Sequence, residues 1–336
     1  MQGRIENGIK QERNVLLKLE NMPSFVNEWY YNLKASQKTV TTLRDYVNKI
    51  HNFLFFINPN VSEVKIKDIN LSNIQKFFIS IQTKEINGQV VYTSDSYQQT
   101  VWCCLNNFLE FLKETGKIDK NYIKMITKPK NKDLEKINEH RMLLTKSDFN
   151  KILKSVKCGA GSDKAIAFQN RMKNRDMSIM LLFMTTGMRK TALSEINIED
   201  IKLDLDVLYV TDKGDKHHTY VLSEKTLDAL NSWLNDRQEW DNGSTNALFI
   251  TEKGDRISSS AIYKLVDKYC TDALGYHVSP HKLRAGFCSI LYEETGNVEF
   301  VRRAVGHSNI STTQRYIVTN NKEKEEASGL IDQILF

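Results

Sequence analysis

Residues 279–284 read SPHKLR, and the fold of the second half of the chain is organised around them. Ser279 can cap a helix, and Pro280 suits the first helical position, where its missing N–H has no intrahelical partner anyway. The sequence therefore predicts that a helix begins here and carries His281 and Arg284 in its opening turns. Residues at i and i+3 share one face of a helix, so these two side chains are expected to lie side by side.

A histidine and a tyrosine follow at short intervals. Residues 298–305 predict a second helix that ends at Gly306, because glycine readily takes the left-handed conformation found after a helix. His307 then falls in the turn beyond, and residues 311–313 offer caps for a short helix that carries Tyr316. Taken singly, each of these residues is more often a structural histidine or a half-buried aromatic than a functional group.

Composition sets broad bounds on the protein. The chain has 336 residues and 40% hydrophobic content, enough for two domains. Its net charge of +6, from 47 basic and 41 acidic residues, favours a polyanionic partner only weakly. The sequence contains no apolar run of about 18 residues, so it predicts no membrane span. Residues 1–20 carry charges where a signal peptide needs an apolar centre. We expect a soluble, cytoplasmic protein without membrane contact.

The first half of the chain predicts a helical domain. After an N-terminal lead over residues 1–22, apolar residues recur at three and four positions in four segments: 24–33, 40–57, 72–81 and 95–112. This spacing predicts amphipathic helices packed into one domain over residues 23–120. The region around Gly88 is polar and is expected to be a loop.

The second half predicts a different mixture. Residues 121–143 shift to Lys, Asn, Asp and Glu around a proline, which predicts an exposed linker. A capping box over residues 145–148 then begins a second domain, assigned to residues 144–336. The apolar run 179–184 predicts a buried helix, and residues 207–210 and 219–222 predict a hairpin. The expected fold class is mainly α with a small antiparallel β-sheet (α+β).

The residue types suit chemistry on a phosphodiester. Nucleophilic cleavage places negative charge on the phosphorus oxygens, so a protein that does it without metal needs arginines, a nucleophile and an acid for the leaving oxygen. His277 and His281 are separated by a proline and lack a carboxylate partner, so a metal site is not predicted. The five cysteines have no CxxC spacing, and no glycine-rich phosphate loop occurs. Residues 217–218, a histidine pair, are expected in a solvated turn.

Five ordered elements resemble one known family. They are Thr186-Gly187-Met188-Arg189, Lys213 in the hairpin, His281-Lys282-Leu283-Arg284, Gly306-His307-Ser308 and Tyr316. Together they resemble the signature of the tyrosine recombinases, the integrase family. The resemblance is strong from residue 144 to residue 316, and residues 23–120 are similar more loosely to the family's helical core-binding domain. It implies an integrase-type catalytic domain that ends in a tail helix.

The resemblance implies a phosphate clamp. Arg189 and Arg284 would hold the non-bridging oxygens of the scissile phosphate, which suits bidentate guanidinium geometry. His307 would add a hydrogen bond, and His281 would assist proton transfer or phosphate binding. Many members carry an acidic residue three positions after the first arginine, where this chain has Ala192. Residues 195 and 199, both glutamates, are candidate substitutes.

The resemblance also implies the covalent chemistry. Tyr316 would attack to give a 3′-phosphotyrosyl DNA and a free 5′-hydroxyl, and Lys213 would protonate the departing 5′ oxygen. Lys216 lies in the same hairpin, so either lysine could be the acid. Because the phosphotyrosine conserves the bond energy, neither ATP, metal nor any other cofactor is expected.

The implied function is site-specific recombination of DNA. The expected partners are double-stranded DNA recombination sites in the nucleoid. A homotetramer would bind two duplexes, and a directionality factor is a possible further partner. Two other hypotheses stay open: a DNA-binding protein without catalysis, and a type IB topoisomerase, which shares the chemistry but acts as a monomer. The sequence does not say whether a mobile element or chromosome-dimer resolution is served.

The tail, residues 319–336, carries an apolar stripe behind a charged spacer. Packing on its own domain is one expectation. The resemblance favours another, in which the tail docks on a neighbouring protomer of the tetramer.

Overall fold

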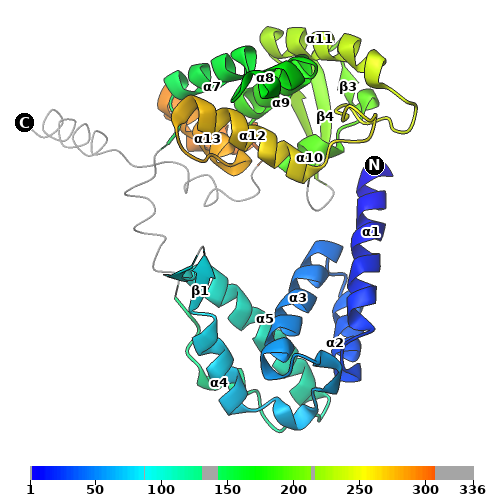
Figure 1. Cartoon of the computed structure of the whole chain (residues 1–336), viewed down its shortest axis with the longest axis vertical. Helices are drawn as coiled ribbons and strands as arrows, with labels where there is room; N and C mark the ends of the chain where they lie inside the picture. The colour runs from blue at the N-terminus through cyan, green and yellow to red at the C-terminus, as the bar shows by residue number, and fades with distance from the viewer. Residues whose placement is uncertain (1, 87, 131–142, 213–215, 307–336) are drawn as a thin grey trace, which may run out of the picture. The chain divides into compact units, whose positions relative to one another are not determined.

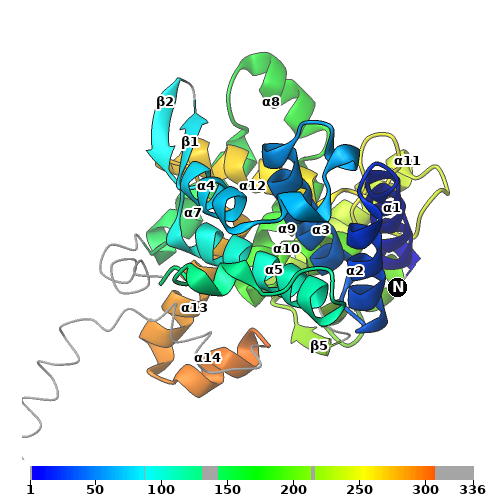
Figure 2. The same ribbon diagram turned by 90° about the horizontal axis from the view of Figure 1, so that it is seen from below.

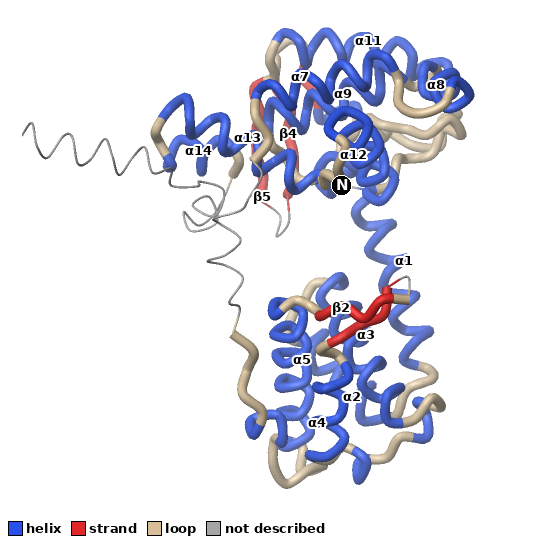
Figure 3. Tube along the Cα trace, turned by 60° about the vertical axis from the view of Figure 1, so that its left-hand side comes forward, coloured by secondary structure: helices blue, strands red, loops and turns tan. Residues whose placement is uncertain are grey.

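The computed structural model describes residues 2–86, 88–130, 143–212 and 216–306, and the chain divides into two compact units, Met1–Ile137 and Asn138–Phe336 (Figure 1). Helices dominate both units, and the strands described form two small antiparallel sheets (Figure 3). The predicted mainly helical fold is therefore confirmed, whereas the bounds proposed for lead, linker and domains stay predictions. Among the described helices, none combines the length and apolarity that a membrane span requires.

The first unit is a helical bundle with one hairpin. Its elements are α1 (Gln2–Leu19), α2 (Ser24–Ala35), α3 (Val40–Ile57), α4 (Leu71–Ser80), β1 (Thr83–Ile86), β2 (Gln89–Tyr92) and α5 (Asp95–Glu114), with short 3-10 turns at Val61–Glu63, Ile66–Asp68 and Tyr122–Met125. Apolar stripes of α2, α3 and α5 meet in its core. There Trp29 packs edge-on against Phe108, with ring centroids 5.1 Å apart, and its indole N–H donates to Asn107.

The N-terminal segment, for which the sequence predicted no helix, forms α1. Helix α1 packs on α3, and it buries Val15 and Leu19 in the core of the unit. Lys18 Nζ donates to Asn48 Oδ1 on α3 at 2.9 Å. Among residues 8–19 of α1, the buried apolar residues are Val15 and Leu19, near the end of the helix, too few for the long apolar stripe that predicts a helix.

The region around Gly88 forms a hairpin rather than the predicted loop. Strands β1 and β2 pair in register from Thr83↔Tyr92 to Ile86↔Gln89 (Figure 2). The side chain of Tyr92 is 87% exposed, and the other strand residues are exposed or only half-buried. The hairpin has no buried face, so its sequence lacks the alternation by which strands are recognised.

The second unit surrounds a three-stranded sheet with helices. Its elements are α7 (Lys146–Cys158), α8 (Asp163–Asn170), α9 (Lys173–Thr186), α10 (Lys190–Glu195), a 3-10 turn (Ile198–Asp200), β3 (Ile201–Lys202), β4 (Val207–Asp212), β5 (Lys216–Val221), α11 (Glu224–Trp240), α12 (Ser259–Leu274), α13 (Pro280–Thr295) and α14 (Val298–Ala304). Helix α9 lies at the centre, in contact with α7, α11 and α13, and its apolar run 179–184 is buried as predicted.

The sheet has the order β3-β4-β5 and is antiparallel throughout. The predicted hairpin is confirmed in β4 and β5, which pair from Val207↔Val221 to Asp212↔Lys216. Residues 217–218 lie within β5 and not in the predicted turn. At the end of β5, Tyr220 is buried and Val221 is exposed, and Leu222, which follows the strand, is buried again, because successive side chains of an extended chain alternate between two faces.

Helices α13 and α14 form a small separate core beside the main one (Figure 2). Ala285, Cys288, Val301 and Val305 are its buried members. The predicted start of α13 is confirmed, since Ser279 Oγ accepts the Lys282 N–H and Pro280 takes the first position.

Candidate active site

A left-handed glycine positions the first candidate arginine. Gly187 ends α9 with φ of 61°, and its N–H donates to the carbonyl of Phe183. The chain then reverses, and Arg189 becomes the N-cap residue of α10. A Cβ at position 187 would lie 2.6 Å from Phe287 Cδ1 of α13, so the turn can approach α13 this closely only with glycine.

The second candidate arginine is buried and held by backbone. Arg284 is 2% exposed; its Nη1 donates to Gly187 O at 2.5 Å and its Nη2 to Val305 O at 2.8 Å. These two bonds join α13 to the end of α9 and to the residue that follows α14. A planar guanidinium fixed by two carbonyls has a defined orientation, and its other N–H groups keep defined directions.

One pocket contains three of the predicted site residues. Its volume is about 330 Å³, and its polar lining comes from the start of α10, from α12 and from the start of α13. The polar side chains that line it are Arg189, Lys190, Thr191, Tyr263, Ser279, His281 and Arg284. His281 is exposed at its rim, and Arg189 is half-buried. The pocket thus contains two guanidinium groups, the side-chain type that suits an oxyanion.

Tyr220 is a further residue beside the two arginines. Its side chain, on β5, is only 7% exposed. Burial raises the pKa of Tyr220, and the positive charges of Arg284 and Arg189 oppose that rise. The hydroxyl therefore keeps its proton near neutral pH and can donate a hydrogen bond. Alternation along β5 predicts an inward side chain here, but no motif marks it.

Three predicted site residues lie outside the described part of the chain: Lys213, His307 and Tyr316. One residue near them in sequence, Val305, accepts a hydrogen bond from Arg284. Gly306 has φ of 67°, and a Cβ there would lie 2.2 Å from the His218 ring on β5, so residues 305–306 pack tightly against the strand. In the backbone register of the hairpin, Lys216 of β5 lies opposite Asp212 of β4.

Ala192, which stands where many members of the family carry an acidic residue, is part of the hydrophobic core. Ala192 is 4% exposed and belongs to the main core. Of its two candidate substitutes, Glu195 is half-buried and Glu199 is exposed, with Asn197 Nδ2 as a hydrogen-bond donor to Glu199. In the described part of the unit, neither carboxylate lines the arginine pocket.

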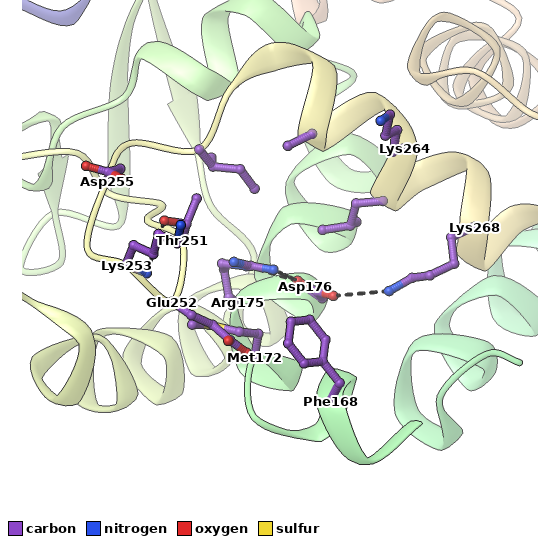
Figure 4. Close-up of a pocket in the computed structure, with 13 residues that line it drawn as sticks. Phe168, Met172, Arg175, Asp176, Thr251, Glu252, Lys253, Asp255, Lys264 and Lys268 are labelled. Carbon is purple, nitrogen blue, oxygen red and sulfur yellow. Dashed lines mark hydrogen bonds and ion pairs between the residues drawn. The ribbon is translucent and has the colours of Figure 1, made fainter. Parts of the chain in front are cut away.

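A second, larger pocket of about 590 Å³ lies between α9, α12 and residues 251–257 (Figure 4). Both signs of charge line it: Arg175, Lys253, Lys264 and Lys268 with Asp176, Glu252 and Asp255. Asp176 is 2% exposed, pairs with Arg175 at 2.8 Å and Lys268 at 3.8 Å, and accepts the Tyr269 hydroxyl at 2.8 Å. These partners connect α9 to α12, and the Asp176 carboxylate is paired with two cations. No group of His, Cys, Asp or Glu among the described residues is arranged to hold a metal ion.

The family comparison covers more than half of the chain. The sequence profile of the Phage integrase family matches residues 144–323. Tyrosine recombinase XerC of Psychromonas ingrahamii is 26% identical over 294 residues, which are 85% of this chain and 89% of that protein. XerC of Shewanella oneidensis is 35% identical over 143 residues, which are 42% and 46% of the two chains.

Solved structures share the fold. XerH site-specific recombinase bound to a palindromic difH substrate, in a post-cleavage complex, aligns with a TM-score of 0.65 over 89% of this chain and 82% of its own, at 20% identity. A lambda integrase tetramer bound to a Holliday junction aligns with a TM-score of 0.59 over 88% and 76%, at 16% identity.

Proposed function

This chain belongs to the Phage integrase family and is a tyrosine recombinase, and on that premise we propose that it cleaves and rejoins DNA strands through a 3′-phosphotyrosyl intermediate, without metal or ATP. The observation that carries the proposal is the pocket that unites Arg189, His281 and Arg284. These residues come from two segments far apart in the sequence, and they meet where a phosphodiester needs positive charge.

The arginines supply electrostatic stabilisation. As the scissile phosphorus becomes pentavalent, charge grows on its non-bridging oxygens, and donors that are already fixed stabilise this charge most. The bonds of Arg284 to two carbonyls provide that fixed geometry before substrate arrives. Arg189 approaches from the start of α10, and His281 adds a donor at the rim.

Tyr316 and Lys213 complete the reaction in this proposal. The Tyr316 hydroxyl loses its proton with the help of His281, and its oxygen bonds to phosphorus as the bond from phosphorus to the 5′ oxygen breaks. Lys213 gives that 5′ oxygen a proton. His307 adds a hydrogen bond to the phosphate. In the reverse direction, a 5′-hydroxyl of another strand attacks the phosphotyrosine and releases Tyr316.

The proposed substrate is double-stranded DNA at specific recombination sites. XerH was solved on its difH substrate, and lambda integrase as a tetramer on a Holliday junction, which supports a homotetramer on two duplexes for this chain. Residues 23–120 would form the core-binding domain and residues 144–336 the catalytic domain, joined by the linker 121–143. The protein would act in the cytoplasm at the nucleoid, and the tail beyond residue 319 lies outside the described residues.

Selection and trapping test the proposal. Duplexes that the full-length protein binds are selected from a random pool, and a nicked suicide version of the selected site is then incubated with it. A covalent protein–DNA adduct on the 3′ side of the break is expected, together with recombination between two sites. A protein that binds the site but forms no adduct is a DNA-binding protein without catalysis. Relaxation of supercoils without paired sites identifies topoisomerase activity instead.

Gly187→Ala should slow adduct formation by more than the loss of folding stability alone would cause. The substitution costs about 1 kcal/mol for the left-handed backbone, and its Cβ also displaces Phe287 or the carbonyl that Arg284 requires. We expect a loss of roughly 10-fold or more in cleavage rate, since misplaced catalytic groups lose rate steeply. Gly296→Ala is the matched control, because Gly296 has φ of 60° at the end of α13 and no atom near its absent Cβ. Equal cleavage by the two variants would show that the contact at Gly187 does not position Arg284.

Lys213→Ala should recover activity on a substrate whose 5′ bridging oxygen is sulfur. A thiolate leaves without a proton, so the substrate bypasses the missing acid. Cleavage rates of Lys213→Ala and Lys216→Ala are compared on the oxygen and sulfur substrates. We expect Lys216→Ala to lose little on either one. Rescue of Lys216→Ala alone would assign the acid to Lys216.

A further inference from the structure

The arginine pocket has a cationic end that the proposed reaction does not use. Lys190 and Tyr263 line the same pocket as Arg189 and Arg284. The Lys190 ammonium lies over the ring of Tyr263, with Nζ 5.1 Å from the ring centroid. A lysine beside an aromatic face has fewer side-chain conformations than a free one, so less entropy is lost when it binds an anion.

A chain of hydrogen bonds holds the Tyr263 ring in place. Its hydroxyl bonds to His277 Nε2 at 2.7 Å, and His277 Nδ1 bonds to the Asp267 carboxylate. Tyr263 and Asp267 are one turn apart on α12, and His277 reaches both from the loop that follows Gly275. Thr271 also donates to Asp267, at 3.2 Å. The Tyr263 ring is thus held at its Cβ end by α12 and at its hydroxyl end by the hydrogen bonds to His277 and from His277 to Asp267, which we call the relay.

The relay contributes little to stability. The side chains of His277 and Asp267 are 56% and 36% exposed, and exposed ion pairs are weak because water screens them. Its main physical effect is to fix the orientation of Tyr263, and through the ring that of Lys190. Side chains fixed in this way at the wall of an anion pocket are typical of a binding site.

We propose that Lys190 forms a second phosphate subsite in this pocket, which binds the backbone phosphate next to the scissile one, and that Tyr263, His277 and Asp267 position it. The inference rests on the proposed function, since it takes the anion to be a DNA strand. Charged phosphates follow one another along each strand, so a pocket that admits one phosphate meets its neighbour as well. The two arginines and His281 serve the scissile phosphate, and Lys190 supplies the cation for the adjacent one.

A binding cycle tests the subsite. The selected DNA site is prepared with a neutral methylphosphonate at the phosphate on either side of the scissile one, in separate duplexes. Binding is measured with the full-length Tyr316→Phe protein, with and without Lys190→Ala. On unmodified DNA, Lys190→Ala should weaken binding and reduce the slope of log affinity against log salt by about 1. On one of the two modified duplexes, Lys190→Ala should weaken binding no further, because the phosphate that Lys190 contacts has already lost its charge.

Variants of Tyr263 test the positioning role in the same cycle. Tyr263→Leu removes the aromatic face and should reduce the coupling between Lys190 and the neutralised phosphate, whereas Tyr263→Phe keeps the face and should retain most of it. Lys225→Ala, an exposed lysine on α11 outside the pocket, is the charge-matched control and should act equally on all duplexes. Full effects of Lys190→Ala on both modified duplexes would overturn the subsite. Adduct formation by the wild-type protein on unmodified DNA is measured as well. If the adduct forms, the proposed reaction stands and only the subsite is overturned.

Discussion

Tyr316→Phe is expected to form no covalent adduct with a suicide substrate while it binds the selected site with unchanged affinity. The substitution removes only the hydroxyl oxygen that would become bonded to phosphorus, and it keeps an aromatic ring of nearly the same size. The adduct is measured on a denaturing gel, and binding is measured by mobility shift. Tyr209→Phe, a half-exposed tyrosine on β4, serves as control and should cleave normally.

An adduct that persists in Tyr316→Phe would assign the nucleophile elsewhere. Two described tyrosines are near enough to the arginines to be examined first: Tyr263 lines their pocket, and Tyr220 lies within reach of both charges. Peptide mapping of the DNA-linked fragment identifies the residue. An adduct at either position would replace Tyr316 in the proposed reaction without changing the phosphate clamp.

Arg284→Ala is expected to slow cleavage by roughly 100-fold or more, because loss of one fixed charge-stabilising donor costs about 3 kcal/mol in the transition state. Arg189→Ala should act similarly. Affinity for intact DNA should change far less, because many other phosphates are held. Single-turnover cleavage rates at saturating protein concentration separate the two effects.

Removal of Arg284 also takes a donor from each of two carbonyls, those of Gly187 and Val305, which destabilises the fold. Arg237→Ala controls for this loss. Arg237 is 3% exposed and donates to the carbonyls of Ala247 and Thr245, yet it does not line the arginine pocket. Both variants should lower the melting temperature, and only Arg284→Ala should slow cleavage by the folded protein. Equal rates would place Arg284 among structural residues.

Local signals in the sequence predicted much of the site. The cap at Ser279 and the glycine at the end of α9 act through neighbouring atoms, so the residues around them suffice to predict them. The same is true of the β4–β5 hairpin. What brings Arg284 to its place is different: its partners are carbonyls of Gly187 and Val305, and any residue type there offers a carbonyl. Such bonds therefore cannot be predicted from residue types in the sequence.

The residues that sequence analysis missed share a lack of local signal. Tyr220 was placed on a strand, but its proximity to both arginines depends on how β5 packs. Tyr263 gains its neighbours only when α12 and the loop before α13 come together. Helix α1 and the β1–β2 hairpin were missed for the opposite reason, because most of their residues face solvent and no apolar stripe or alternation marks them.

The bond from Arg284 to Val305 O couples two equilibria. The guanidinium has this partner only while α14 is docked on α13, and the core that holds α14 there has just four buried members among the described residues. Segments with so few buried contacts open more readily than the rest of a domain. A phosphate that binds the oriented arginine therefore favours the docked helix, and undocking weakens phosphate binding by the same factor. We therefore expect docking of α14 and phosphate binding by Arg284 to strengthen or weaken together.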